Sequence, residues 1–170
     1  PKTPFELVHR LDRPTSGCLL VAKNRKSLTA VQNSWRESQV QKQYLALLVG
    51  HLPSPSLIVE APLIKMRRNN DESFMVVDDE KGKPSKTTFE EIERYEDTSL
   101  AKITLHTGRM HQIRVHSKYI EHPILGDDKY GDKAFNQAHK AKRLFLHAHS
   151  LIFTYQDKQI KVEAPWNPEF

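Results

Sequence analysis

His9–Gly17 read HRLDRPTSG, and this stretch places one carboxylate, Asp12, between Arg10 and Arg13. A proline and a glycine inside the stretch disfavour a helix, so we predict a loop. Neighbouring positive charge favours the ionised carboxylate, and loops on a rigid scaffold often carry catalytic side chains. We interpret the stretch as an active-site loop. The alternative is a surface turn in which Asp12 only hydrogen-bonds nearby backbone.

A second informative stretch is GRMHQIRVHSKYIEHP at Gly108–Pro123, which predicts a helix that ends at His122 because a proline follows. Four residues recur at helical spacing and are predicted to face the core: Met110, Ile113, Ser117 and Ile120. Arg114 falls on or beside that stripe, and a buried guanidinium needs an anion, for which Asp12 is a candidate. The alternative is an arginine whose stem covers apolar surface while its head reaches water.

The 170 residues fit one domain with a substantial core, without linker, repeat or low-complexity tract. A helix is predicted over Lys26–Ser38, where Leu28, Val31 and Trp35 recur at helical spacing. Short apolar runs predict the strands: Leu19–Ala22, Leu45–Val49, Leu57–Ile64, Phe74–Val77, Leu100–Leu105, Leu144–Phe153 and Ile160–Val162. Strands outnumber helices, which indicates an α+β fold.

The composition favours a polyanionic partner, because 26 Lys and Arg against 21 Asp and Glu leave a net charge of +5. Basic runs at Lys23–Lys26, Lys65–Asn70 and His139–Arg143 contrast with an acidic run at Glu90–Asp97, which suggests a basic face. The single cysteine excludes an internal disulfide and fits the cytoplasm. The spacing of the nine histidines indicates no metal site, and no apolar run is long enough to span a bilayer.

The two motifs together resemble the pseudouridine synthases of the RluA group, in the order expected for that family. The resemblance extends over nearly the whole chain, through KQYLALLVG at Lys42–Gly50, GKPSKTTF at Gly82–Phe89, HPILGDDKYGD at His122–Asp132 and RLFLHAHSLIF at Arg143–Phe153. Within the group it is most similar to the RluC subgroup. The resemblance implies a mixed, largely antiparallel β-sheet with flanking helices and a central catalytic cleft, and isomerisation of uridine to pseudouridine without a cofactor.

The resemblance also implies three catalytic residues: Asp12, Tyr44 and Arg114. Asp12 attacks the anomeric carbon or acts on a ribose proton, and both routes need its carboxylate form. Arg114 holds Asp12 charged and oriented. Tyr44 stacks on the uracil, and it is a candidate for removing the C5 proton, although a phenol is a poor base near neutral pH. Without the resemblance, Tyr44 reads as a strand residue packed in the core.

A uridine in folded RNA must be extruded from its stack before its glycosidic bond can be rearranged. The resemblance implies that Arg10 enters the space that the flipped base leaves. Arg13, Arg109 and Lys118 are candidates for phosphate contacts, and ordinary solvated charge is the alternative for each.

The start of the chain departs from the family pattern, because an upstream strand segment and the small RNA-binding domain of the S4 kind found in the RluC type are absent. We therefore expect residues 1–170 to be the catalytic domain of a monomer, with RNA, in particular large-subunit (23S) ribosomal RNA, as the partner. Three alternatives stay open: a synthase acting on transfer RNA, a catalytically silent RNA-binding domain, and an unrelated acid–base enzyme acting on a small substrate.

Overall fold

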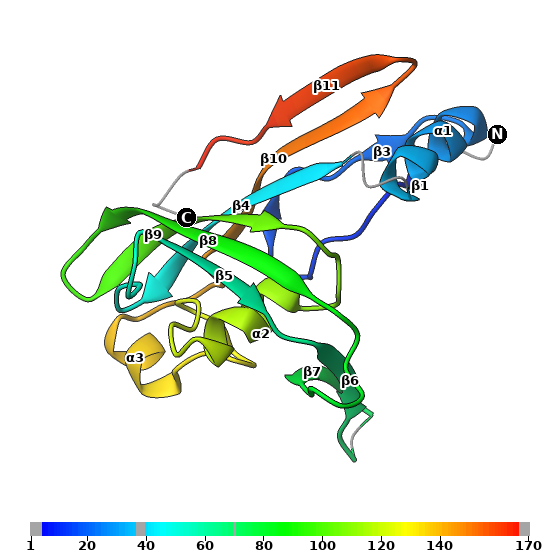
Figure 1. Cartoon of the computed structure of the whole chain (residues 1–170). Coiled ribbons are helices and arrows are strands. Elements are labelled where there is room, and N and C mark those ends of the chain that lie inside the picture. Colours follow the sequence, from blue (N-terminus) through cyan, green and yellow to red (C-terminus); the bar gives the residue numbers. More distant parts are fainter. Residues whose placement is uncertain (1–4, 37–39, 70, 167–170) are drawn as a thin grey trace. The chain divides into compact units, whose positions relative to one another are not determined.

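The computed structural model describes residues 5–36, 40–69 and 71–166, and its chain divides into two compact units. The first unit combines residues 1–44 with residues 147–170, and the second comprises residues 45–146. Figure 1 labels the elements of both units except β2. No helix in the described part of the chain is long and apolar enough to cross a membrane. The expectation of one catalytic domain over the whole chain stays a prediction.

In its described residues, the first unit contains one helix and several strands around a small apolar core. Its elements are β1 Glu6–Leu7, β2 Ser16–Gly17, β3 Val21–Ala22, α1 Arg25–Arg36, most of β10 Leu146–Tyr155, and β11 Lys158–Glu163. Strands β10 and β11 form a long antiparallel hairpin, while β2 pairs with β10 in parallel. Strand β1 pairs with β3 in an antiparallel ribbon. The pairing is therefore mixed and largely antiparallel, as expected.

Helix α1 confirms the predicted helix and begins one residue earlier than expected. The last two residues of the prediction, 37 and 38, lie outside the described residues, as does Gln39. Asn24 caps its start, because the side-chain oxygen accepts the backbone N–H of Ser27 at 2.9 Å. Val31 of α1 packs with Leu151 and Phe153 of β10. The apolar residues that recur at helical spacing on α1 thus face this unit's core.

Within the residues that the structure describes, the second unit contains two hairpins and two short helices. Its elements are β5 Ser56–Glu60, β6 Leu63–Arg67, β7 Ser73–Val77, β8 Lys86–Arg94, β9 Thr98–Leu105, α2 Gln112–Tyr119 and α3 Lys133–Ala138. Strand β8 pairs antiparallel with both β5 and β9, and β6 pairs antiparallel with β7. Strand β4 Gln41–Val49 begins in the first unit and ends in this one.

The prediction of one strand over Leu57–Ile64 is wrong. The run is divided into β5 and β6, and between them Ala61 N–H bonds to Ser85 while Pro62, which has no N–H, interrupts the ladder. The acidic run Glu90–Asp97 was not predicted as a strand, yet its first half lies in β8. There Glu90 faces Lys102 of β9, and the two side chains form an ion pair at 3.0 Å.

Candidate active site

The HRLDRPTSG stretch is a loop around a tight turn, as predicted. The turn runs from Asp12 to Thr15, whose N–H donates to the Asp12 carbonyl at 2.9 Å. Asp12 is half-buried, whereas Arg10 and Arg13 are exposed. The loop therefore shelters its carboxylate and presents both arginines to solvent.

One end of the loop is anchored through His9. The Leu20 N–H donates to His9 Nε2 at 3.0 Å, and the imidazole stacks on Trp35 with 5.4 Å between ring centres. Burial, together with the charge of Lys42, lowers the pKa of His9. The ring is thus held neutral as an acceptor, which fixes the chain three residues before Asp12.

The other end of the loop is anchored on β10. Strand β2 runs beside it, and Cys18 N–H donates to the Ala148 carbonyl at 2.8 Å. Gly17 has a φ of +110°, and a Cβ there would lie 2.2 Å from the Ala148 oxygen, so only glycine fits. Ser16 Oγ is hydrogen-bonded to His147 Nδ1 at 2.8 Å. Both ends of the Asp12 loop are therefore fixed within the first unit.

Tyr44 lies on β4 in the same unit as Asp12 and is half-buried. Burial, and after it the negative charge of Asp12, together raise the pKa of Tyr44 to about 12. The structure therefore brings these two predicted residues close enough for one to influence the other. It also keeps the Tyr44 phenol protonated throughout the neutral range.

Arg114 is buried on α2, with its side chain 4% exposed, as its place beside the apolar stripe predicted. Its Nε and Nη2 each donate to a different carboxylate oxygen of Asp127, both at 2.7 Å. Nη2 also reaches Asp128 at 3.2 Å, and the guanidinium lies over the Tyr130 ring. The snorkelling alternative is therefore wrong, and the bidentate anion is Asp127, which we did not predict.

Asp127 stabilises a turn as well as the arginine. Its Oδ1 accepts the backbone N–H groups of Lys129 and Tyr130, each at 2.9 Å. Burial would raise the pKa of Asp127, but hydrogen bonds from Arg114 and from these N–H groups outweigh burial and lower it. Asp12 lies in the first unit and Arg114 in the second, and the pairing of these two side chains stays a prediction.

The signal for Asp127 was present in HPILGDDKYGD, where two adjacent acids follow a glycine, but it did not say which buried cation they face. The preceding Gly126 has a φ of +76°, which sharply turns the chain before the acids. Sequence reasoning also missed His116, which is fully buried and bonds to Ala61 O at 2.9 Å and Thr87 Oγ1 at 2.8 Å. Burial lowers the pKa of His116, consistent with a neutral core ring.

The remaining candidates for RNA contacts are exposed. Arg109 donates to the Pro84 carbonyl through Nε and Nη2, while the Lys118 side chain is at the surface of α2. Among residues 5–36, 40–69 and 71–166, no group of three or more His, Cys, Asp or Glu side chains is arranged to hold a metal ion. Contact with phosphate stays a prediction for Arg10, Arg13, Arg109 and Lys118.

Two curated relatives of this chain carry the same name. The chain is 48% identical over 170 residues to the ribosomal large subunit pseudouridine synthase C of Pasteurella multocida (strain Pm70), which covers 97% of this chain and 52% of that protein. It is 47% identical over 173 residues to the protein of the same name from Escherichia coli (strain K12), covering 97% and 54%. The chain thus spans about half the length of the curated relatives it matches.

Known structures and a family model agree with these relatives. The human RNA pseudouridylate synthase domain containing 1 superposes with a TM-score of 0.85 at 30% identity, covering 95% of this chain and 69% of that chain. The human RNA pseudouridylate synthase domain containing 4 shares the fold, with a TM-score of 0.81 at 24% identity and coverage of 98% and 73%. The model of the RNA pseudouridylate synthase family matches residues 2–119. The resemblance inferred from the motifs is therefore confirmed, and the chain belongs to the RNA pseudouridylate synthase family.

Proposed function

We propose that this chain isomerises uridine to pseudouridine in RNA, with large-subunit ribosomal RNA as its substrate. Membership of the family supports the reaction, and the names of the curated relatives support the substrate. The observation that carries the proposal is the anchored loop that holds the Asp12 carboxylate close to the Tyr44 phenol. We place the chain in the cytoplasm and expect it to act as a monomer.

The reaction needs a carboxylate because the bond between uracil N1 and the ribose anomeric carbon must break before C5 can bond to that carbon. Asp12 supplies the electron pair, either to the anomeric carbon or to a ribose proton. The C5 proton leaves and N1 takes up a proton, so atoms balance without a co-reactant. The half-buried position of Asp12 leaves the carboxylate reachable for the substrate.

Tyr44 contributes mainly as a neutral aromatic ring against the uracil. With a pKa of about 12, roughly one phenol in 10⁵ is ionised at pH 7. Part of that elevation comes from the charge of Asp12, and this part disappears when Asp12 is consumed in a covalent bond or protonated. Proton removal by Tyr44 is therefore easier late in the reaction than at its start.

We propose Arg114 as a positioning residue because its motif resembles the family motif that carries the basic partner of the catalytic aspartate. Its buried pair with Asp127 fixes the guanidinium in one orientation, which is what a positioning residue requires. Arg10 is exposed and can fill the space of an extruded base. Arg13, Arg109 and Lys118 are proposed phosphate contacts.

The experiment that tests this function uses the 170-residue chain and its Asp12→Ala variant. Each is incubated with an in vitro transcript of large-subunit ribosomal RNA, which contains no pseudouridine, and the product is mapped at nucleotide resolution. We expect pseudouridine at defined positions with the unchanged chain and none with Asp12→Ala, while RNA binding is retained. Asp157→Ala, in the exposed turn between β10 and β11, is the matched control and should match the unchanged chain.

Each alternative has its own outcome in this experiment. Product on transfer RNA transcripts but not on ribosomal RNA would change the substrate, and RNA binding without product on any RNA would favour the silent binding domain. Binding of RNA that does not weaken as salt rises would contradict a phosphate-based interface. Full activity of Asp12→Ala would overturn the proposed mechanism.

A further inference from the structure

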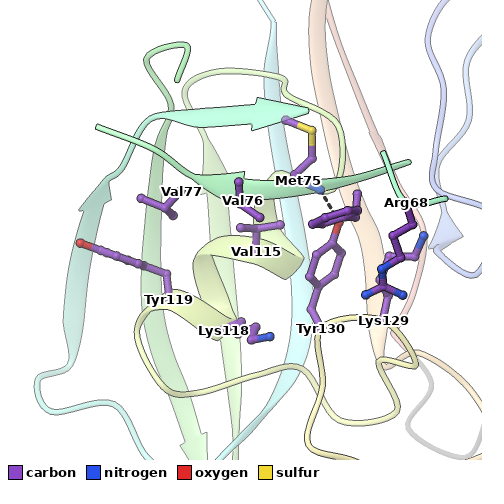
Figure 2. Close-up of a pocket in the computed structure, with 10 residues that line it drawn as sticks. Arg68, Met75, Val76, Val77, Val115, Lys118, Tyr119, Lys129 and Tyr130 are labelled. Atoms are coloured by element: carbon purple, nitrogen blue, oxygen red, sulfur yellow. Dashed lines mark hydrogen bonds between the residues drawn. The ribbon is translucent and has the colours of Figure 1, made fainter. Parts of the chain in front are cut away.

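A pocket of about 330 Å³ lies in the second unit between β7 and α2 (Figure 2). Val76 and Val115 form its apolar wall, and Tyr119 stands at one end. The volume is at the lower end of the roughly 300–1,000 Å³ found for small-molecule sites. It therefore suits one nucleotide and is too small for a stretch of duplex.

The pocket offers an exposed aromatic side chain. The Tyr119 side chain ends α2 and is 56% exposed. Phe74, by contrast, already has the guanidinium of Arg68 over its ring, 5.1 Å from the ring centre. Because every nucleobase has a π face, an exposed tyrosine beside an apolar wall is a stacking platform of the kind that binds unpaired nucleotides.

The charge at the pocket fits a phosphate. Arg68, Lys118 and Lys129 line it, and one carboxylate, Glu72, pairs with two of them: with Lys129 at 2.5 Å and with Arg68 at 3.3 Å. Three cations against one carboxylate leave an excess of two positive charges. Within residues 5–36, 40–69 and 71–166, Lys118 forms no ion pair, so its ammonium group is available to an external anion.

Tyr130 lines the pocket and also contacts the buried Arg114. The Tyr130 hydroxyl accepts the Met75 N–H at 2.9 Å and is hydrogen-bonded to His111 Nδ1 at 2.7 Å, which fixes the ring. On this ring lies the Arg114 guanidinium, 5.2 Å from its centre. An occupant of the pocket therefore touches the same side chain that supports Arg114.

From this arrangement we infer that the pocket binds one unpaired nucleotide of the RNA substrate, distinct from the uridine that is isomerised. Its base stacks on Tyr119 and lies against Val76 and Val115, while its phosphate meets Lys118 and Arg68. This inference rests on the proposed function for the nature of the ligand, since a pocket of this chemistry on its own fits any nucleotide. It gives the substrate a second point of attachment within the second unit.

The test measures RNA binding and steady-state kinetics for Tyr119→Ala and Lys118→Gln on the large-subunit transcript. We expect Tyr119→Ala to weaken binding and raise KM roughly ten-fold with kcat unchanged, as expected from losing one stacked base. Lys118→Gln should reduce the salt slope of binding by about one. The matched controls are Tyr95→Ala, a tyrosine 42% exposed just after β8, and Lys81→Gln, an exposed lysine after β7. Neither should change KM or the slope.

A crosslinking experiment identifies directly which part of the chain contacts the RNA. RNA containing 4-thiouridine is irradiated with the unchanged chain, and the crosslinked peptide is sequenced; the expected peptide contains Tyr119. Unchanged KM and salt slope in both variants, with no crosslink at α2, would overturn the inference even if pseudouridine forms. If the chain makes no pseudouridine but Tyr119→Ala and Lys118→Gln still weaken RNA binding, the proposed function fails and the nucleotide pocket stands.

Discussion

The two charged regions of the candidate site are built in opposite ways. In the first unit, Asp12 sits half-buried on a loop whose neighbouring arginines are exposed. In the second unit, Arg114 is buried and forms two hydrogen bonds to Asp127, whose side chain is 1% exposed. A group that must react has to remain reachable, whereas a group that only orients others is best locked by its neighbours. The comparison thus contrasts Asp12, the proposed reactive carboxylate, with Asp127, a structural one.

The same substitution in each region should give opposite results, and this is the largest expected effect. Asp12→Asn is expected to lower pseudouridine formation at least about 10⁴-fold, because a nucleophile or base is removed, with stability changed by no more than about 1 kcal/mol. Asp127→Asn is expected to destabilise the fold by about 3–5 kcal/mol, because the buried Arg114 loses the charge of its bidentate partner. Single-turnover assays and urea unfolding measure the two quantities, and similar profiles for the two variants would remove the distinction.

The next prediction concerns the buried pair itself. Arg114→Met alone should destabilise the chain by about 3–5 kcal/mol, because Asp127 then remains as an unpaired buried charge. In the double variant Arg114→Met with Asp127→Asn both charges are gone, and Asn still offers an acceptor to the turn N–H groups. We expect a coupling energy of about 2 kcal/mol or more from urea unfolding, with activity still lost. Additive stabilities would contradict a structural pair, and recovered activity would remove Arg114 from the mechanism.

A third prediction concerns Tyr44, whose pKa is raised in part by the charge of Asp12. Tyr44→Phe keeps the stacking ring and should lower kcat about 10–100-fold by removing the hydroxyl, whereas KM should stay unchanged. Tyr44→Leu should raise KM as well, since stacking is lost. A Tyr44→Phe variant with normal kcat would show that only the ring matters.

The smallest expected effect is on the pH dependence of stability. Burial lowers the pKa of His9 in the first unit and of His116 in the second, so below about pH 6.5 the unfolded chain binds protons that the folded chain does not. Stability is therefore full above about pH 6.5 and declines as pH falls toward the lowered values, at no more than about 1.4 kcal/mol per pH unit for each ring. Urea unfolding between pH 7.5 and 5 should show this decline, and His9→Gln and His116→Gln should each remove part of it.

His139 provides the control of opposite sign. The Phe135 carbonyl and then Asp97 raise the pKa of His139, so its contribution is present below about pH 6.5 and is lost as pH rises. His139→Gln should therefore make the acid decline steeper. A stability that is flat from pH 7.5 to 5 in all variants would contradict both assignments.

Much of the local structure could be predicted from the sequence. The proline and glycine in HRLDRPTSG predicted a loop, and helical spacing predicted α1, α2 and the inward direction of Arg114. These features depend on residues a few positions apart, so their cause is visible in the chain itself. The strand over Lys86–Arg94 was missed, because charged residues such as Glu90 gain their partners only across a sheet. The division of Leu57–Ile64 was also missed, although its cause, Pro62, is visible in the sequence.

The sequence by itself determined the family, the loop around Asp12 and the burial of Arg114. Only the tertiary structure decided which carboxylate faces that arginine, how far the pKa of Tyr44 rises, and that Tyr130 is shared between Arg114 and a pocket. The physical reason is the range of the interactions. Backbone preference and periodicity act between neighbours, whereas ion pairing and desolvation depend on segments that are distant in the chain and meet only when it folds.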